Sequence, residues 1–214
     1  MKKRAALGVR MHSGWGVLVA VSGDAHSLEL VDRRRIVTTD SRMRGANQPY
    51  HHAANLGLRE SKKYLENCEA VSERLALAAL DEAVQELKGR NYRVTGSAIL
   101  LASGRLLPSL SEILASHPLI HTAEGEFFRN SIRHACDRLK IRVTTIRERE
   151  LEELARAVFG KSASQVQDRI ASLGRAIGPP WTKDHKAAAL AGLIVLADAG
   201  PKASGGVPEG SLVR

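Results

Sequence analysis

The order of apolar segments along the chain is the strongest constraint on its fold. Three stretches rich in apolar and β-branched residues, 5–11, 15–21 and 28–37, follow one another near the start of the chain. The short segments between them contain the turns HSG and SGDA, and glycine-containing turns of this kind join neighbouring antiparallel strands. We therefore predict that the chain begins with three consecutive antiparallel strands.

After a polar loop at residues 38–49, the chain alternates between helix-like and strand-like segments. Apolar residues recur with the 3.6-residue period of a helix from about Tyr50 to Lys88, a region in which Gly57 is a potential break. Residues 92–102 then read as a buried strand and residues 141–146 as a fifth strand. Further helices are predicted at 108–115, from a cap at Thr122 to Leu139, at 148–159, at 163–173 and at 183–199.

This order predicts an α/β fold built on one mixed sheet. Connections from strand to helix to strand are right-handed and join parallel strands, so helices should cover both faces of a five-stranded sheet. A chain of 214 residues can bury a sizeable core as one domain, which we expect over residues 1–199. Residues 200–214 are rich in Gly, Pro and Ser, and they are predicted to be a disordered tail.

The charge of the chain points to a polyanionic partner. Lys and Arg number 32 against 23 Asp and Glu, which gives a formal net charge of +9. Such an excess favours nucleic acid, because each neutralised phosphate releases condensed counterions, although a generally basic surface without a dedicated partner is the alternative. Aromatic residues make up only 4% of the chain, which disfavours a single-strand binder built from stacked aromatic platforms.

Other sequence features bear on the compartment. No apolar stretch approaches the roughly 18 residues that a membrane span requires, and the apolar run after the basic N-terminus is too short for a secretory signal. The two cysteines, Cys68 and Cys136, both lie in helical patterns and indicate no disulfide framework. We expect a soluble protein of the reducing cytoplasm, without a membrane partner.

Two segments resemble the ribonuclease H-like nucleases, in particular the bacterial Holliday-junction resolvases. LGVRMHSGWGVLVAV has the shape of that family's first strand, turn and second strand. SASQVQDRIASLGRAIGPPWTKDHKAAALAGLIVLAD is similar to its last part, a glutamine-containing helix, a proline-bearing loop and an acidic, alanine-rich helix. The resemblance covers most of residues 5–198 and implies a ribonuclease H-like mixed five-stranded sheet. It also implies a nuclease site in which carboxylates bind magnesium.

The carboxylates that this resemblance implies are incomplete. The position that corresponds to the family's first-strand acid is Arg10, whose charge would repel a metal, and the fourth strand ends LLAS without an acid. Asp184 is the one family carboxylate that can be carried over, although an acid at that place also suits the start of a helix. We therefore expect a nucleic-acid-binding protein whose metal-nuclease site is degenerate or altered. Whether it is an enzyme, and whether it uses magnesium, stays open.

The segment SHPLIHTAEGEFFR supplies a second set of candidate residues. His117, His121 and Glu124 could meet on a loop at the end of the sheet, where open α/β sheets bind ligands, and take part in metal binding or proton transfer. Pro118 argues against one helix through both histidines, and Thr122 suits a helix cap. The alternative is a capped helix with an ordinary polar lead-in.

The adjacent His51 and His52 are a weaker candidate. Consecutive residues of a helix point about 100° apart, so the two rings are poor joint ligands for one metal ion. We expect them at a solvent-exposed helix start.

The first turn and the third strand supply the remaining candidates. Turn amides and a guanidinium could together bind the phosphate of a small molecule, and this reading uses Arg10, His12, Ser13 and Gly14. An enzyme or sensor for a phosphorylated small molecule is therefore the alternative function. On the third strand, Arg33 and Arg35 should point to one side, where they contact phosphates or protect an exposed sheet edge.

Overall fold

One mixed sheet of five strands forms the centre of the computed structural model, which describes residues 2–102 and 106–198. The strands are β1 (Lys3–Met11), β2 (Trp15–Ser22), β3 (Glu29–Val37), β4 (Tyr92–Leu101) and β5 (Val143–Arg147), in the order β3-β2-β1-β4-β5. β2 is antiparallel to β1 and β3, whereas β4 is parallel to β1 and β5. The predicted mixed sheet is confirmed, with β1 at its centre. The tail predicted at 200–214 lies outside the described residues.

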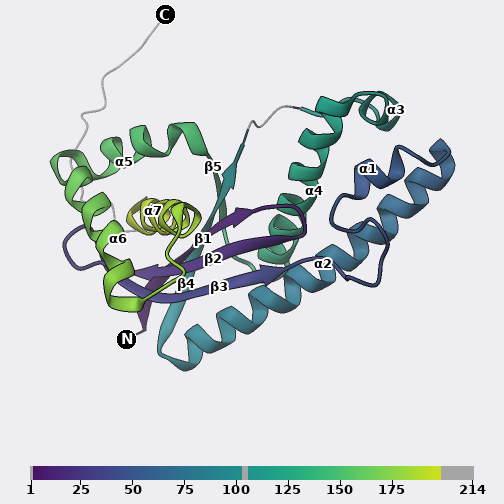
Figure 1. Ribbon diagram of the computed structural model, residues 1–214. Helices are drawn as coiled ribbons and strands as arrows, with labels where there is room; N and C mark the ends of the chain where they lie inside the picture. The colour runs from purple at the N-terminus through teal and green to yellow at the C-terminus, as the bar shows by residue number, and fades with distance from the viewer. Residues whose placement is uncertain (1, 103–105, 199–214) are drawn as a thin grey trace, which may run out of the picture.

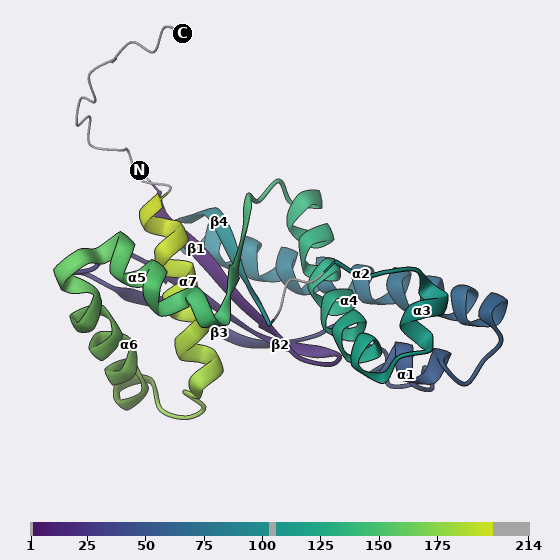
Figure 2. The same cartoon turned by 90° about the horizontal axis from the view of Figure 1, so that it is seen from above.

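Helices cover both faces of this sheet (Figure 1). α2 (Leu58–Gly89) and α4 (His117–Arg138) pack on one face. α7 (Lys183–Asp198) packs on the other, and α5 (Leu151–Phe159) and α6 (Ala163–Ile177) lie against it. The short helices α1 (Pro49–Ala53) and α3 (Leu110–Leu114) lie beside α4, beyond one end of the sheet (Figure 2). Single 3-10 turns at Glu148–Glu150 and Gly160–Ser162 precede α5 and α6.

The two faces of the sheet bury separate apolar cores. Leu7 and Val9 of β1 belong to the core beneath α2 and α4, whereas Ala6 belongs to the core beneath α7. Successive side chains of a strand point to opposite faces, so Gly8 and Arg10 lie on the same side as Ala6. None of the helices in the described ranges combines the length and apolar character that a bilayer crossing demands.

The break expected at Gly57 within the helical region 50–88 is confirmed, because Gly57 has extended backbone angles and precedes α2 as its N-cap. The predicted start of the next long helix, with a cap at Thr122, is wrong. α4 begins at His117 with Pro118 in its first turn, a position where proline needs no hydrogen-bonding partner. Thr122 lies inside α4 and its hydroxyl donates to the Pro118 carbonyl at 3.0 Å, so it is not a cap.

α7 approaches the centre of the sheet closely at Gly8. A Cβ atom built on Gly8 would lie 1.8 Å from the carbonyl oxygen of Ala188. A Cβ atom on Gly192 would lie 3.2 Å from the backbone nitrogen of Gly8. The absence of side chains at these two glycines allows the helix and strand backbones to touch.

We expect Gly8→Ala to lower the free energy of unfolding by about 2 kcal/mol or more, because an overlap with backbone cannot be relieved by turning a side chain. Urea denaturation followed by circular dichroism measures this change. Gly89→Ala is the matched control, since nothing lies within 4 Å of a Cβ atom there. Equal unfolding midpoints for the two variants would contradict the close contact between α7 and β1.

Both cysteine side chains are buried. Cys68 of α2 is 4% exposed and Cys136 of α4 is 0% exposed. Burial raises the pKa of the Cys136 thiol to about 11 and also raises the pKa of the Cys68 thiol above its usual value.

Because the thiolate is the reactive form, we expect neither cysteine to react with a thiol reagent in the folded protein at about pH 8, and both to react in urea. Absorbance after addition of an aromatic disulfide reagent counts the reactive thiols. Rapid reaction in the native state would be incompatible with the packing of α2 and α4 on the sheet.

Candidate functional site

The parallel strands bring distant residues to one edge of the sheet. β1, β4 and β5 are parallel, so their carboxyl ends lie at the same edge, which is where open α/β sheets bind ligands. Arg10 is close to the end of β1, Glu148 directly follows β5, and Asp184 lies in the first turn of α7. Because Arg10 is on the face of β1 that α7 covers, these three side chains meet.

The guanidinium of Arg10 forms ion pairs with both carboxylates. Its Nε donates to Glu148 Oε1 at 2.9 Å and its Nη2 donates to Glu148 Oε2 at 3.1 Å, which makes the contact bidentate. Its Nη1 lies 2.7 Å from Asp184 Oδ1. The side chains of Arg10 and Asp184 are each 22% exposed, so solvent screens these charges less than it screens those of a surface ion pair.

His12 completes this group of charges. Its Nε2 lies 2.9 Å from Arg10 Nη1 and 2.9 Å from Asp184 Oδ2. Nε2 donates to Asp184 when it carries a hydrogen, and accepts from Arg10 when it does not. The His12 ring stacks on Trp15 with 4.3 Å between the ring centroids. The guanidinium of Arg35 lies 4.5 Å from the centroid of the Trp15 ring. Trp15 therefore fixes the position of His12.

The site does not fit the magnesium ion that the resemblance implies. Mg²⁺ is bound by oxygen ligands, and the two carboxylates here each hold the Arg10 guanidinium within hydrogen-bonding distance. A metal placed between them would face the positive charge of Arg10. The last residues of β4, Leu100 and Leu101, are buried and apolar and offer no ligand.

The first turn packs against the chain that follows β3. Gly14 has a φ of +78°, and a Cβ atom there would lie 2.6 Å from Asn47 Oδ1. The Gly14 carbonyl accepts a hydrogen bond from the backbone of Thr38 at 2.9 Å, and Ser13 is exposed. Arg10, which the phosphate-binding hypothesis needs, is engaged with the two carboxylates.

Arg33 and Arg35 make different contacts on β3, which is an edge strand as expected. The Arg33 guanidinium donates to the carbonyls of residues 177–180 at distances from 2.6 to 3.3 Å. It therefore holds the loop that leads into α7. Arg35 is exposed, so its charge can contact a partner in solution.

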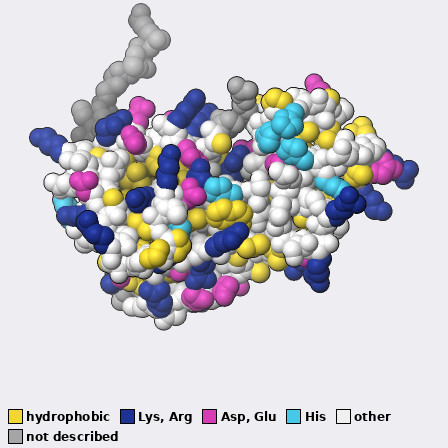
Figure 3. Space-filling model, viewed as in Figure 1, with side chains coloured by type: hydrophobic (Ala, Val, Ile, Leu, Met, Phe, Trp, Pro, Cys, Tyr) yellow, Lys and Arg dark blue, Asp and Glu magenta, His cyan; other side chains and the backbone are white. Residues whose placement is uncertain are grey.

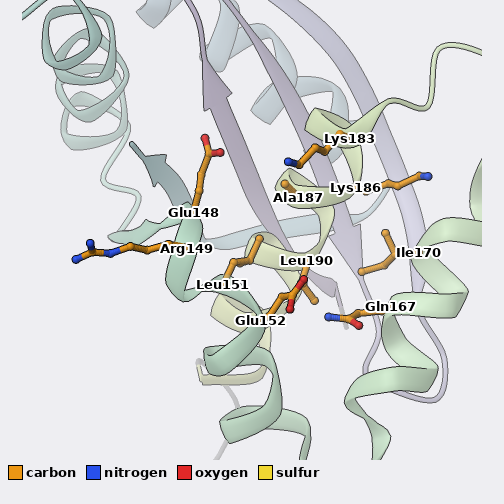
Figure 4. A pocket seen from close by; sticks show the side chains of 10 residues that line it. All are labelled: Glu148, Arg149, Leu151, Glu152, Gln167, Ile170, Lys183, Lys186, Ala187 and Leu190. Carbon is orange, nitrogen blue, oxygen red and sulfur yellow. The ribbon is translucent and has the colours of Figure 1, made fainter. Parts of the chain in front are cut away.

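Two hollows flank the ion pairs, and Lys183 lines both. One has a volume of about 500 Å³, lies between α5, α6 and α7, and includes Glu148 and Lys186 (Figure 4). The other has a volume of about 620 Å³ and is lined by Trp15, Arg35 and the start of α7. Lys183 and Lys186 are exposed, and no ion pair within residues 2–102 and 106–198 joins either of them to a carboxylate.

His185 also lines the second hollow, and the sequence patterns did not identify it. It is 8% exposed, and burial lowers its pKa, with a further contribution from Arg33. Its Nδ1 lies 3.2 Å from the backbone N–H of Thr182, which donates to it, and 2.8 Å from the Thr182 hydroxyl. His185 is therefore a neutral residue that fixes the start of α7.

The structure places His117, His121 and Glu124 in a separate group, away from Asp184. All three lie on α4, and the prediction that they lie on a loop is wrong. They meet His51 of α1, which is half-buried and not fully exposed as expected.

Glu148 and His51 are further residues that the sequence patterns did not place in a site. Glu148 could have been recognised from its position directly after a parallel strand. His51 carried no such signal.

Known proteins resemble the chain in structure only. No family model matches it, and no curated protein matches it by sequence. Thermus thermophilus RuvC in complex with Holliday junction substrate is 9% identical over 92% of this chain and 94% of that chain, with a TM-score of 0.50. Another structure of Thermus thermophilus RuvC is 10% identical over 91% and 95% of the two chains, with a TM-score of 0.49. An Aquifex aeolicus Ppx/GppA phosphatase is 13% identical over 75% of this chain and 42% of that chain, with a TM-score of 0.37.

The first of these similarities extends over nearly the whole of both chains. At 9% identity it concerns the path of the backbone and not the residues of the site. It agrees with the strand order and with helices on both faces of the sheet. The chain therefore has the ribonuclease H-like fold, in the form in which the RuvC resolvase has it.

Proposed function

We propose that the protein binds nucleic acid on the face around Arg10, and that the metal-dependent cleavage of the resolvases is lost at this site or uses other residues. The observation that carries this proposal is the position of Arg10 between Glu148 and Asp184. A catalytic metal would need those carboxylates as ligands. Here the guanidinium of Arg10 occupies that position and pairs with both carboxylates.

The charge around the site supports nucleic acid as the partner. Lys183, Lys186 and Arg35 are exposed beside the two hollows, and Lys and Arg side chains stand out on this side of the molecule (Figure 3). Lysine and arginine contacts to phosphates position a protein on nucleic acid without reading its sequence. RuvC of the same fold is recorded with a Holliday junction, so a four-way DNA junction is the first ligand to test.

We expect the protein to bind a fluorescent four-way junction with a dissociation constant that rises steeply between about 50 and 200 mM salt, as counterion release requires. The double variant Lys183→Glu, Lys186→Glu should weaken binding about tenfold or more and reduce the salt dependence. Fluorescence anisotropy measures both quantities.

The matched control is Lys62→Glu, Lys63→Glu, which changes the net charge equally at exposed positions of α2, on the opposite face of the sheet. This control should bind more tightly than the α7 double variant. Binding that ignores salt, or equal losses in the two double variants, would contradict the proposed surface.

We expect the wild-type protein to leave a labelled junction uncut in Mg²⁺ or Mn²⁺, or to cut it equally well after Asp184→Asn. The reason is that Asp184 and Glu148 are both already paired with the Arg10 guanidinium. Denaturing gel electrophoresis of the labelled strands detects cleavage. Metal-dependent cleavage that Asp184→Asn abolishes would reveal a working metal site and refute the proposal.

A further inference from the structure

We propose that His51, His117 and His121 form a binding site for a divalent transition-metal ion with the coordination preference of zinc. One ring nitrogen from each histidine lies within 4.8 Å of the others. His51 comes from α1, and the other two from the first turns of α4. Histidine side chains gather over these helices in Figure 3, away from the sheet edge that holds Arg10. The site is independent of the proposed nucleic-acid binding.

The spacing of the rings fits a single ion. Zinc lies about 2.0–2.1 Å from histidine nitrogens, so two ligand nitrogens in a tetrahedral site are about 3.4 Å apart. His51 Nε2 and His117 Nε2 are 3.4 Å apart. The ring centroids of the three pairs are 5.2, 4.7 and 4.5 Å apart, and the ring planes are steeply inclined to one another, at 78°, 66° and 88°. The rings therefore meet edge to face and do not stack, and a ring nitrogen of each remains within 4.8 Å of the other two.

The helix geometry explains why His117 and His121 meet. Residues four apart on a helix lie on the same face, one turn above the other. Pro118 occupies the first turn of α4, so it permits this arrangement. α1 crosses this face and adds the third ring.

Glu124 selects the nitrogen that His51 presents. Its Oε1 lies 2.9 Å from His51 Nδ1 and accepts a second hydrogen bond from the His51 backbone at 3.1 Å. Because a carboxylate accepts the hydrogen bond, Nδ1 carries the proton and the lone pair is on Nε2, toward His117. A carboxylate behind a ligating histidine orients the ring and makes it a stronger ligand. Glu124 is only 3% exposed, so it is a fixed part of the site.

The ligand chemistry indicates the class of metal. Three imidazole nitrogens suit zinc, nickel, copper or cobalt, whereas magnesium and calcium require oxygen ligands. His117 and His121 are exposed, so water or a bound molecule can take the remaining coordination position. An ion held by all three rings would also link α1 to α4 and stabilise their contact.

The test uses protein treated with a chelator, then titrated with Co²⁺ and with Zn²⁺. We expect one Co²⁺ per chain, with the strong visible absorption of a tetrahedral site, and a rise in the melting temperature with Zn²⁺. His117→Ala and His121→Ala should each remove both signals. Glu124→Gln keeps the shape of the side chain and should lower the affinity for Zn²⁺ about 10- to 100-fold.

His52→Ala is the matched control, because His52 lies next to His51 on α1 but packs against Tyr64, with 4.7 Å between the ring centroids. It should retain both signals. Wild-type protein that is folded by circular dichroism yet shows neither signal would overturn the proposal, as would equal binding by His117→Ala and wild type. These measurements involve no nucleic acid, so their failure is distinct from a failure to bind DNA.

Discussion

The contact between α7 and β1 determines where the charges of the sheet edge meet. Gly8 touches Ala188, and from this contact Arg10 lies two residues further along β1 while Asp184 lies four residues back along α7. Two strand residues span about 6.8 Å and four helix residues about 6 Å, so the two side chains arrive at the same level. The Arg10–Asp184 ion pair therefore requires a small residue at position 8, although Gly8 itself does not contact the ion pair.

The Arg10 guanidinium offsets part of the negative charge of Glu148 and Asp184. Removing Arg10 would leave Glu148 and Asp184 facing each other without a cation, and their repulsion would favour either protonation or capture of an external ion. His12 lies between Arg10 and Asp184, and can add a second positive charge when it is protonated. The basic side chains beside this group, Lys183, Lys186 and Arg35, are exposed and can contact phosphates.

The sequence predicts the fold better than the site. Strand alternation and helix periodicity are local properties, and they were sufficient for the sheet, its mixed character and the position of Arg10 at the end of β1. The ion pair between Arg10 and Glu148 forms because the carboxyl ends of β1 and β5 lie near each other in the sheet. The strand order that brings them together cannot be read from local sequence patterns. His51 reaches His117 through the packing of α1 on α4, and no local pattern reports that packing. The start of α4 was predicted too late because proline breaks a helix interior but suits its first turn, where Pro118 lies.

We infer that Arg10 takes the place of a catalytic metal at the carboxyl edge of the sheet. A crystal structure of the protein grown in Mn²⁺, with anomalous diffraction recorded, tests it most directly. We predict that the guanidinium of Arg10 contacts both carboxylates and that no anomalous peak lies between Glu148 and Asp184. A peak bound by both carboxylates, with Arg10 turned away from them, would contradict the claim.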